Sequence, residues 1–161
     1  IRRQRQMCIR DRYGGTYHYI YAPLFVNSEE VRDSLEQEPN IKGCLELARN
    51  ADIILTSVGS IVYKSWKSYL STRDLYNLEK KGAIGHIGGH FYDMEGNEVI
   101  TPFVNKMIGL GIEDIKNTEN VICVAGLEMK AEAILGAVRG GYINTLITDE
   151  EAAKAVLALC K

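Results

Sequence analysis

The chain has 161 residues, of which 46% are hydrophobic and 25% are charged, a composition typical of one globular domain that buries a core. Disordered and collagen-like chains are thereby excluded, and a formal net charge of -2 provides no general attraction for nucleic acid or an anionic membrane. We expect a cytoplasmic protein, because no apolar run approaches the roughly 20 residues of a membrane span and no secretory signal opens the chain.

Residues 1–12 differ in composition from everything that follows. They read IRRQRQMCIRDR, with five arginines and no periodicity. Such a segment could be a basic arm, but it more closely resembles the translated sequencing adaptor found at the ends of proteins from fragmentary assemblies. We therefore predict that residues 1–12 are a non-native segment and that residues 13–161 form part of one domain.

The first half of that domain alternates between predicted strands and helices. YHYIYAP at residues 17–23 predicts a strand, and the acidic stretch after Ser28 predicts a short helix that is broken at Pro39. Residues 41–50 are expected to form a second helix, and residues 53–58 a strand buried on both faces.

The middle of the chain interrupts the alternation. Ser71, with Asp74 three residues later, predicts the N-cap of a helix that runs to Lys81. Residues 82–100 contain too many glycines for a helix, so we expect a loop followed by a β-hairpin with residues 93–96 in its turn.

The C-terminal part returns to regular alternation. We expect helices at residues 112–117, 129–139 and 149–159, and strands at residues 121–126 and 143–147. Thr148 and Glu151 fit a capping box for the last helix.

Strands separated by helices predict an α/β fold. βαβ crossovers produce a mainly parallel sheet, so we expect three layers with helices on both faces and an inserted β-hairpin. Residues 53–58, 121–125 and 143–147 should be neighbouring parallel strands.

Ligands of such folds bind beyond the carboxyl ends of the strands. There, Gly59 would let the backbone approach an anion and Ser60 would add a hydroxyl donor, although both could form a plain turn. At a second corner, Gly126 leads to Lys130 in the first turn of a helix, where its ammonium could bind an oxyanion or simply be solvated.

His86 and His90 are four residues apart, which on a helix would suggest a metal site. The glycines around them argue against a helix and no third ligand stands nearby, so we expect no metal. Since residues four apart also share a face of an extended chain, His86 is the candidate for contacting a ligand, whereas His90 should pack in the hairpin. Asp149 and Glu150 are expected to cap a helix rather than act in catalysis.

Two further groups of residues have less specific patterns. Cys8, Cys44, Cys123 and Cys160 form no CxxC pair, and Cys44 and Cys123 are expected in the core. An aromatic and basic cluster could stack nucleobases, but we favour a mobile loop that covers a pocket or a subunit contact. Its members are Tyr63, Lys64, Trp66, Lys67 and Tyr69.

Several motifs occur together in a specific order: YIYAP, ADIILTSVGS, GAIG followed by FYD, NVICVAGLEMKAEAILGAVRGG and LITDE. From Thr16 to the C-terminus this order resembles the sugar-binding domain of SorC-type transcriptional regulators. The resemblance implies a fold like that of sugar-phosphate isomerases, a phosphorylated sugar as effector, and an N-terminal helix-turn-helix. It also implies that the helix-turn-helix and the first part of the effector domain are absent from this sequence.

Carried over residue by residue, the resemblance assigns the family's small loop to Gly59 and Ser60 and its helix lysine to Lys130. The chain departs from the family pattern in having His86 where an acidic residue is usual, and Leu127 where a second glycine is frequent.

The leading hypothesis is therefore a bacterial effector-sensing module that binds a phosphorylated sugar and controls DNA binding by the full protein. It implies no cofactor, contact with operator DNA only through the missing helix-turn-helix, no membrane partner, and a homo-oligomer at full length. An alternative is a sugar-phosphate isomerase or deaminase with His86 as its base. A third is a structural or oligomerisation domain whose ligand site has decayed.

Overall fold

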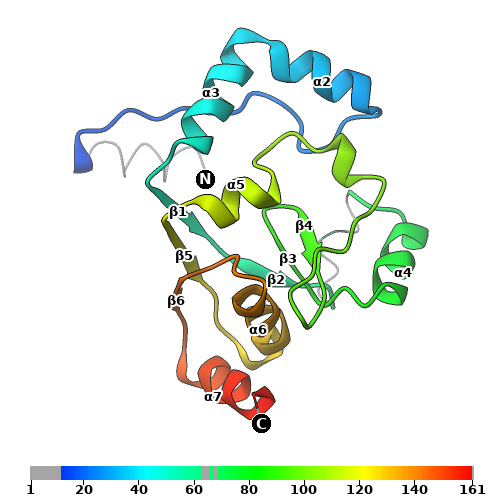
Figure 1. Ribbon diagram of the computed structural model, residues 1–161, viewed down its shortest axis with the longest axis vertical. Coiled ribbons are helices and arrows are strands. Elements are labelled where there is room, and N and C mark those ends of the chain that lie inside the picture. Colours follow the sequence, from blue (N-terminus) through cyan, green and yellow to red (C-terminus); the bar gives the residue numbers. More distant parts are fainter. Residues whose placement is uncertain (1–11, 63–65, 67–68, 161) are drawn as a thin grey trace.

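The computed structural model describes residues 12–62, 66 and 69–160 (Figure 1). Its first sheet has the strand order β1-β5-β6, and both neighbouring pairs are parallel. The strands are β1 (Ile53–Thr56), β5 (Asn120–Val124) and β6 (Thr145–Ile147). The predicted parallel neighbours are confirmed, and so is the α/β fold class.

A second, antiparallel sheet lies beside the first. It consists of β2 (Val58–Ser60), β3 (Gly85–Ile87) and β4 (His90–Tyr92), in the order β2-β3-β4. The prediction of one strand at residues 53–58 is therefore wrong, because the chain leaves the parallel sheet at Ser57 and pairs with β3 instead.

The expected hairpin is present, but its turn is earlier than predicted. Strands β3 and β4 are joined by Gly88 and Gly89, whose φ angles of 59° and 104° are accessible mainly to glycine. The predicted turn at residues 93–96 follows the hairpin, where Asp93 Oδ1 accepts hydrogen bonds from the backbone N–H groups of Glu95 and Asn97.

The helices agree with their sequence predictions to within a few residues. They are α2 (Glu29–Gln37), α3 (Pro39–Arg49), α4 (Thr72–Lys80), α5 (Ile112–Asn117), α6 (Ala131–Arg139) and α7 (Glu150–Leu159). The 3-10 turns η2 (Val104–Lys106) and η3 (Glu128–Lys130) complete the described elements, and η3 leads directly into α6.

Local capping interactions explain where the helices begin. The Ser28 hydroxyl accepts the N–H of Val31, and Ser71 and Asp74 form the predicted capping box. Pro39 begins α3 rather than merely ending α2, because the first turn of a helix tolerates a residue without an N–H.

The predicted capping box of Thr148 and Glu151 is wrong. Asp149 is the N-cap of α7, and its Oδ1 accepts the N–H of Ala152 at 2.8 Å. A carboxylate satisfies this donor as well as a hydroxyl does and also interacts favourably with the helix dipole.

The strand expected at residues 17–23 is not formed. This segment is irregular, and the adjoining Phe25 makes an isolated bridge to Met107. Alternation of side chains favours an extended chain, but a strand also needs a neighbour to complete its ladder of hydrogen bonds.

The main core lies between the parallel sheet and the helices α5 and α6 (Figure 1). Val121 and Cys123 of β5 pack there together with Ile115 of α5 and Ile134 of α6. A second cluster, around Phe91, is shared by the hairpin, α4 and neighbouring loops. Across the residues that the structure describes, no helix is long and apolar enough to cross a membrane.

Candidate functional site

The strands β2 and β3 bring Gly59 and His86 together. The two residues are direct partners in the antiparallel register. A Cβ atom at position 59 would lie 2.1 Å from His86 Nε2, so the imidazole occupies the space that the glycine leaves. Gly59 does allow a close approach, as predicted, but in this structure the approaching group is His86.

His86 lies in a largely apolar environment. Its ring is 4.9 Å from the Trp66 ring and 5.6 Å from the Phe91 ring, measured between centroids. Burial, reinforced by the positive charge of Lys130, lowers the pKa of His86 to about 4. His86 is therefore neutral at pH 7, with one ring nitrogen able to donate a hydrogen bond and the other able to accept one.

Lys130 approaches the same place from η3, which packs against β2. Its charge acts on the pKa of both His86 and Cys123, so its ammonium lies near these two side chains. Lys130 is partly buried, and none of the ion pairs among the described residues includes it. Burial raises the pKa of the Cys123 thiol, which supports its predicted role as a core residue.

Ser60 is adjacent to this group but is turned into the protein. Only 5% of its surface is exposed, and its Oγ accepts the N–H of Val62 at 3.4 Å. The hydroxyl oxygen thus stabilises the turn that follows β2. This agrees with the alternative prediction that Ser60 forms a plain turn and does not bind an anion.

At the second predicted corner, where Gly126 leads toward Lys130, the side chain of Asp149 holds the backbone in place. Its Oδ2 accepts the N–H of Leu127 at 2.7 Å, while its Oδ1 caps α7. Hydrogen bonds from Ala152 and Leu127 lower the pKa of this carboxyl group. A Cβ atom at Gly126 would lie 2.2 Å from Asp149 Oδ2, so the space beside Gly126 is filled by a carboxylate.

Leu127 has an unusual backbone conformation at this corner. Its φ of 78° and ψ of 134° make it the one non-glycine residue with positive φ in the described chain. Such a conformation is strained for a residue with a Cβ atom. A glycine at position 127 would adopt this conformation without that strain.

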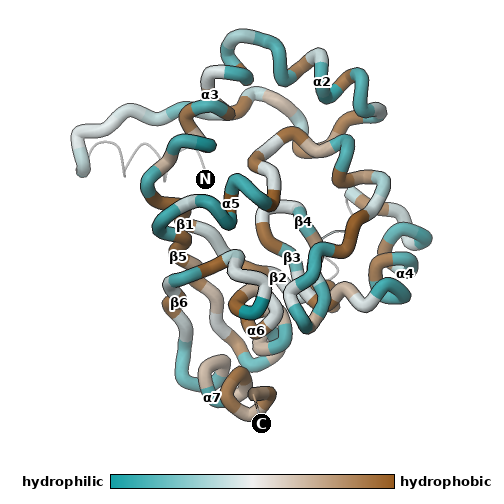
Figure 2. Tube along the Cα trace, in the orientation of Figure 1, coloured by the Kyte–Doolittle hydropathy of each residue, from teal (hydrophilic) through white to brown (hydrophobic). Residues whose placement is uncertain are grey.

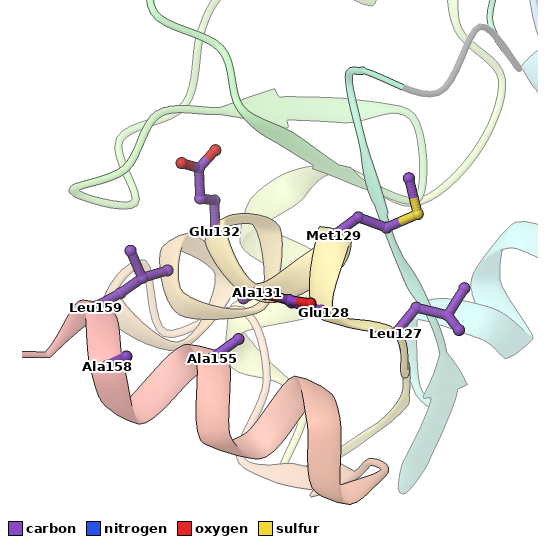
Figure 3. Close-up of a pocket in the computed structure, with 8 residues that line it drawn as sticks. All are labelled: Leu127, Glu128, Met129, Ala131, Glu132, Ala155, Ala158 and Leu159. Atoms are coloured by element: carbon purple, nitrogen blue, oxygen red, sulfur yellow. The ribbon is translucent and has the colours of Figure 1, made fainter.

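A hollow of about 730 Å³ lies between η3 and α7 (Figure 3). Its lining is apolar apart from two glutamates and comprises Leu127, Glu128, Met129, Ala131, Glu132, Ala155, Ala158 and Leu159. The carboxylates make this hollow unfavourable for a phosphate, and neither His86 nor Lys130 lines it.

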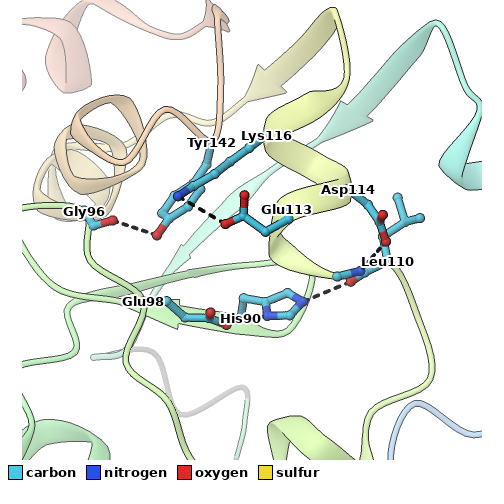
Figure 4. Close-up of polar contacts among 9 residues, drawn as sticks. His90, Gly96, Glu98, Leu110, Glu113, Asp114, Lys116 and Tyr142 are labelled. Carbon is cyan, nitrogen blue, oxygen red and sulfur yellow. Dashed lines mark hydrogen bonds and ion pairs between the residues drawn. The ribbon is translucent and has the colours of Figure 1, made fainter. Parts of the chain in front are cut away.

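His90 lies on the opposite face of the hairpin from His86, because the register pairs His86 with Phe91 and His90 with Ile87. The expectation that the two histidines share a face is thus wrong: the turn between them breaks the extended chain. His90 is buried between Glu98 Oε1 at 2.7 Å and the Leu110 carbonyl at 2.9 Å (Figure 4), as expected for a packed residue. Among the described residues, no group of three potential ligands could hold a metal.

The aromatic and basic cluster is described only in part, since Tyr63, Lys64 and Lys67 lie outside the described residues. Trp66 is only 7% exposed and packs against Phe25, so its ring has little surface for stacking on a base. Its Nε1 is buried without a hydrogen-bond partner in the described structure.

Comparison with known proteins gives this geometry a family context. The model of the Sugar-bind family of sugar-binding domains matches residues 6–158. The chain belongs to this sugar-binding domain family. The sugar-binding domain is 35% identical over 144 residues to the transcriptional regulator LsrR of Escherichia coli K12, a match that covers 86% of the chain and 45% of LsrR.

Solved structures agree with this assignment. The sugar-binding domain of a transcriptional repressor from Vibrio fischeri superposes with a TM-score of 0.83 and 30% identity, over 94% of this chain and 62% of that one. The full-length sorbitol operon regulator SorC from Klebsiella pneumoniae superposes with a TM-score of 0.87 and 25% identity, over 92% and 49%. The SorC-type resemblance is confirmed, and the chain spans less than half of the curated relatives it matches.

The five residues that the sequence predicted as ligand contacts thus lie in two separate parts of the sugar-binding domain. Gly59, His86 and Lys130 converge, with Ser60 beside them, whereas Gly126 belongs to the corner filled by Asp149. The sequence did not predict the hydrogen bond from the Leu127 N–H to Asp149, nor the packing of aromatic rings against His86.

Proposed function

We propose that this sugar-binding domain is the effector-sensing part of a bacterial transcriptional regulator and that its effector is a phosphorylated sugar. The effector binds one state of the full protein more tightly than another and thereby changes its affinity for operator DNA. DNA contact comes from a helix-turn-helix outside this sequence, and the complete protein is a homo-oligomer. In this proposal, residues 1–12 are non-native and residues 13–161 are part of the effector domain.

The observation that carries the proposal is the position of Lys130 beside the neutral His86. A partly buried ammonium without a carboxylate partner among the described residues is suited to a charged oxygen of a ligand. His86 can both donate to and accept from sugar hydroxyls. Together the two side chains offer one position for a phosphate and one for the sugar.

The Asp149 corner is a less suitable place for the phosphate. The N–H of Leu127, which would face an anion bound there, already donates to Asp149 Oδ2 at 2.7 Å. A phosphate beside this carboxylate would also be repelled by it. We therefore assign the phosphate to Lys130 and a structural role to Gly126.

The enzyme alternative is supported less well. A general base is most effective when its pKa lies near the working pH, and His86, with a pKa of about 4, is a weak base. Its hydrophobic neighbours Trp66 and Phe91 favour a neutral contact with a ligand over proton transfer.

Calorimetric titration with pentose and hexose phosphates, each paired with its unphosphorylated sugar, tests the proposal. We expect a phosphorylated sugar to bind at least ten times more tightly than its free counterpart, without release of a transformed product. Equal affinities for the paired sugars would contradict the phosphate assignment, and steady turnover of the ligand, followed by NMR, would contradict the binding-only function.

A further inference from the structure

Trp66 has a buried polar atom that the fold does not use. The side chain is buried, and its Nε1 has no hydrogen-bond partner in the described structure. The indole N–H is a donor only, so it needs an acceptor atom. Native proteins seldom leave a buried donor unpaired, because its desolvation costs free energy. A partner from outside the fold is therefore expected for this N–H.

The surroundings of the indole on one side are apolar. Its ring packs against those of Phe25 and Phe91, with centroids 5.9 and 5.2 Å away. These rings belong to the cluster around Phe91, and the strands β3 and β4 and helix α4 beside it include strongly hydrophobic stretches (Figure 2). Phenyl rings carry no oxygen or nitrogen acceptor, so this wall of the cluster cannot pair the N–H.

The backbone of Trp66 is fixed by two hydrogen bonds. Its carbonyl oxygen accepts the N–H of Tyr69 at 2.9 Å and that of Leu70 at 2.8 Å, which forms a short helical turn. Leu70 is itself buried in the cluster around Phe91. The indole is thus held by its backbone as well as by its packing, and its N–H is a preorganised donor.

The indole also contacts His86, which the proposed function assigns to the ligand. The two ring centroids are 4.9 Å apart and the ring planes are perpendicular. Among the described residues, no hydrogen bond involves the ring nitrogens of His86, and this residue is only partly buried. Lys130, whose charge acts on His86, is likewise absent from the ion pairs of the described chain. Three side chains near one imidazole thus have polar atoms that the fold leaves unpaired, as expected of groups that bind a ligand.

We propose that Trp66 is a further ligand-binding residue, whose indole N–H donates a hydrogen bond to a sugar oxygen of the effector. This inference rests on the proposed function, because it concerns the same site. The sugar lies against His86 and Trp66, and the phosphate is bound by Lys130. Since the indole can only donate, the sugar must have an acceptor there, namely a hydroxyl, ring or carbonyl oxygen. An analogue that lacks this oxygen leaves the N–H unpaired and binds less well.

Replacement of the N–H by sulfur tests the proposal. Trp66 is the only tryptophan in the 161-residue sequence, so growth of a tryptophan auxotroph on benzothienylalanine changes this position alone and nearly keeps the shape of the ring. Calorimetry with pentose and hexose phosphates should show about threefold to tenfold weaker binding than in the parent, as expected when one hydrogen bond to a neutral group is lost. Tyr69→Phe removes a hydroxyl from a neighbouring ring of the same cluster. This matched control should bind as tightly as the parent does.

A measurement without sugar separates a binding role from a structural one. The indole N–H donates to no group of the described fold, so its replacement by sulfur should leave the melting temperature unchanged or raise it by up to about 3 °C. A lower melting temperature would show that the N–H is bonded within the protein, which would overturn the proposal.

Nuclear magnetic resonance observes the donor directly. Isotope-labelled tryptophan gives a single indole N–H signal in the 161-residue chain, because the sequence has one tryptophan. Saturation with the sugar phosphate that binds most tightly in calorimetry should move this proton to lower field, as hydrogen bonding does. An unchanged signal, or equal affinities of the parent and the sulfur analogue, would overturn this inference while leaving the proposed function intact. If no sugar phosphate binds the parent, the proposed function fails and this inference fails with it.

Discussion

The His86 imidazole lies against the backbone of Gly59, and any Cβ atom at position 59 would stand 2.1 Å from His86 Nε2. The ring cannot easily move away, because Trp66 packs edge-on against it with centroids 4.9 Å apart. Gly59 and His86 are thus a coupled pair, and the size of one residue decides where the other can lie.

Gly59→Ala is therefore expected to lower the free energy of unfolding by about 1 to 3 kcal/mol, the usual cost of forcing an extra methyl group into a packed site. Urea unfolding followed by circular dichroism measures this loss. In a His86→Ala background the same substitution should cost much less, because the clashing ring is gone. An identical cost in both backgrounds would contradict the coupling.

The lowered pKa of His86 makes stability depend on pH in a defined window. The pKa is about 4 in the folded chain and about 6.5 when unfolded, so the unfolded chain binds a proton first as the pH falls. This preferential protonation of the unfolded chain should have no effect on stability above pH 6.5. Near pH 4 it should reduce the free energy of unfolding by up to about 3 kcal/mol.

Urea unfolding at several pH values between 7.5 and 4 tests this dependence in the parent and in His86→Phe. The carboxylates titrate in both proteins, so the difference between the two profiles isolates His86. We expect the parent to lose more stability than His86→Phe below pH 6.5. Parallel profiles would show that His86 is not held in its neutral form by burial.

Lys130→Met should weaken binding of a sugar phosphate by roughly one to two powers of ten, because a charge-assisted hydrogen bond is worth about 1.5 to 3 kcal/mol. Methionine retains much of the packing of the lysine stem, so lost charge is the main change. Calorimetry measures the affinity, and Lys42→Met, at an exposed position of α3, is the matched control.

If both variants bind as tightly as the parent, Lys130 is not a phosphate ligand. A covalent Schiff base between its amine and an open-chain sugar is a separate possibility, and borohydride trapping with mass spectrometry distinguishes it from ionic binding.

Leu127→Gly should stabilise the fold by about 1 kcal/mol, because glycine relieves the strain of a positive φ. Chemical unfolding of the variant measures the gain. Leu127→Ala is the control, since alanine keeps the Cβ atom and hence the strain; it should give no gain. Stabilisation by alanine as large as that by glycine would assign the effect to the exposed leucine side chain instead.

His86→Asp should change which sugar phosphate binds best in the complete protein. An aspartate only accepts hydrogen bonds and would lie near the Lys130 ammonium, whereas neutral His86 can both donate and accept. Competition calorimetry with a panel of sugar phosphates measures the ranking, and circular dichroism confirms that the variant folds. An unchanged ranking would indicate that His86 is a packed residue of the hairpin without a role in selectivity.

The sequence by itself determined the helices, the parallel neighbours and the family. The N-caps at Ser28 and Ser71 lie where their residue types predict, because a cap is an interaction between residues two or three apart in the chain. Strands β5 and β6 follow from apolar runs separated by a helix, because a parallel crossover is the natural connection between two such runs.

Only the tertiary structure decided which residues meet across the sheets. The division of residues 53–58 at Ser57, the contact of His86 with Gly59 and the reach of Asp149 to Leu127 all depend on partners more than 20 residues away in sequence. Side-chain alternation predicts an extended chain but does not specify its neighbour, and for this reason residues 17–23 were predicted as a strand that the structure does not form. The pairing of strands is a non-local choice, so it could be known only once the whole chain had packed.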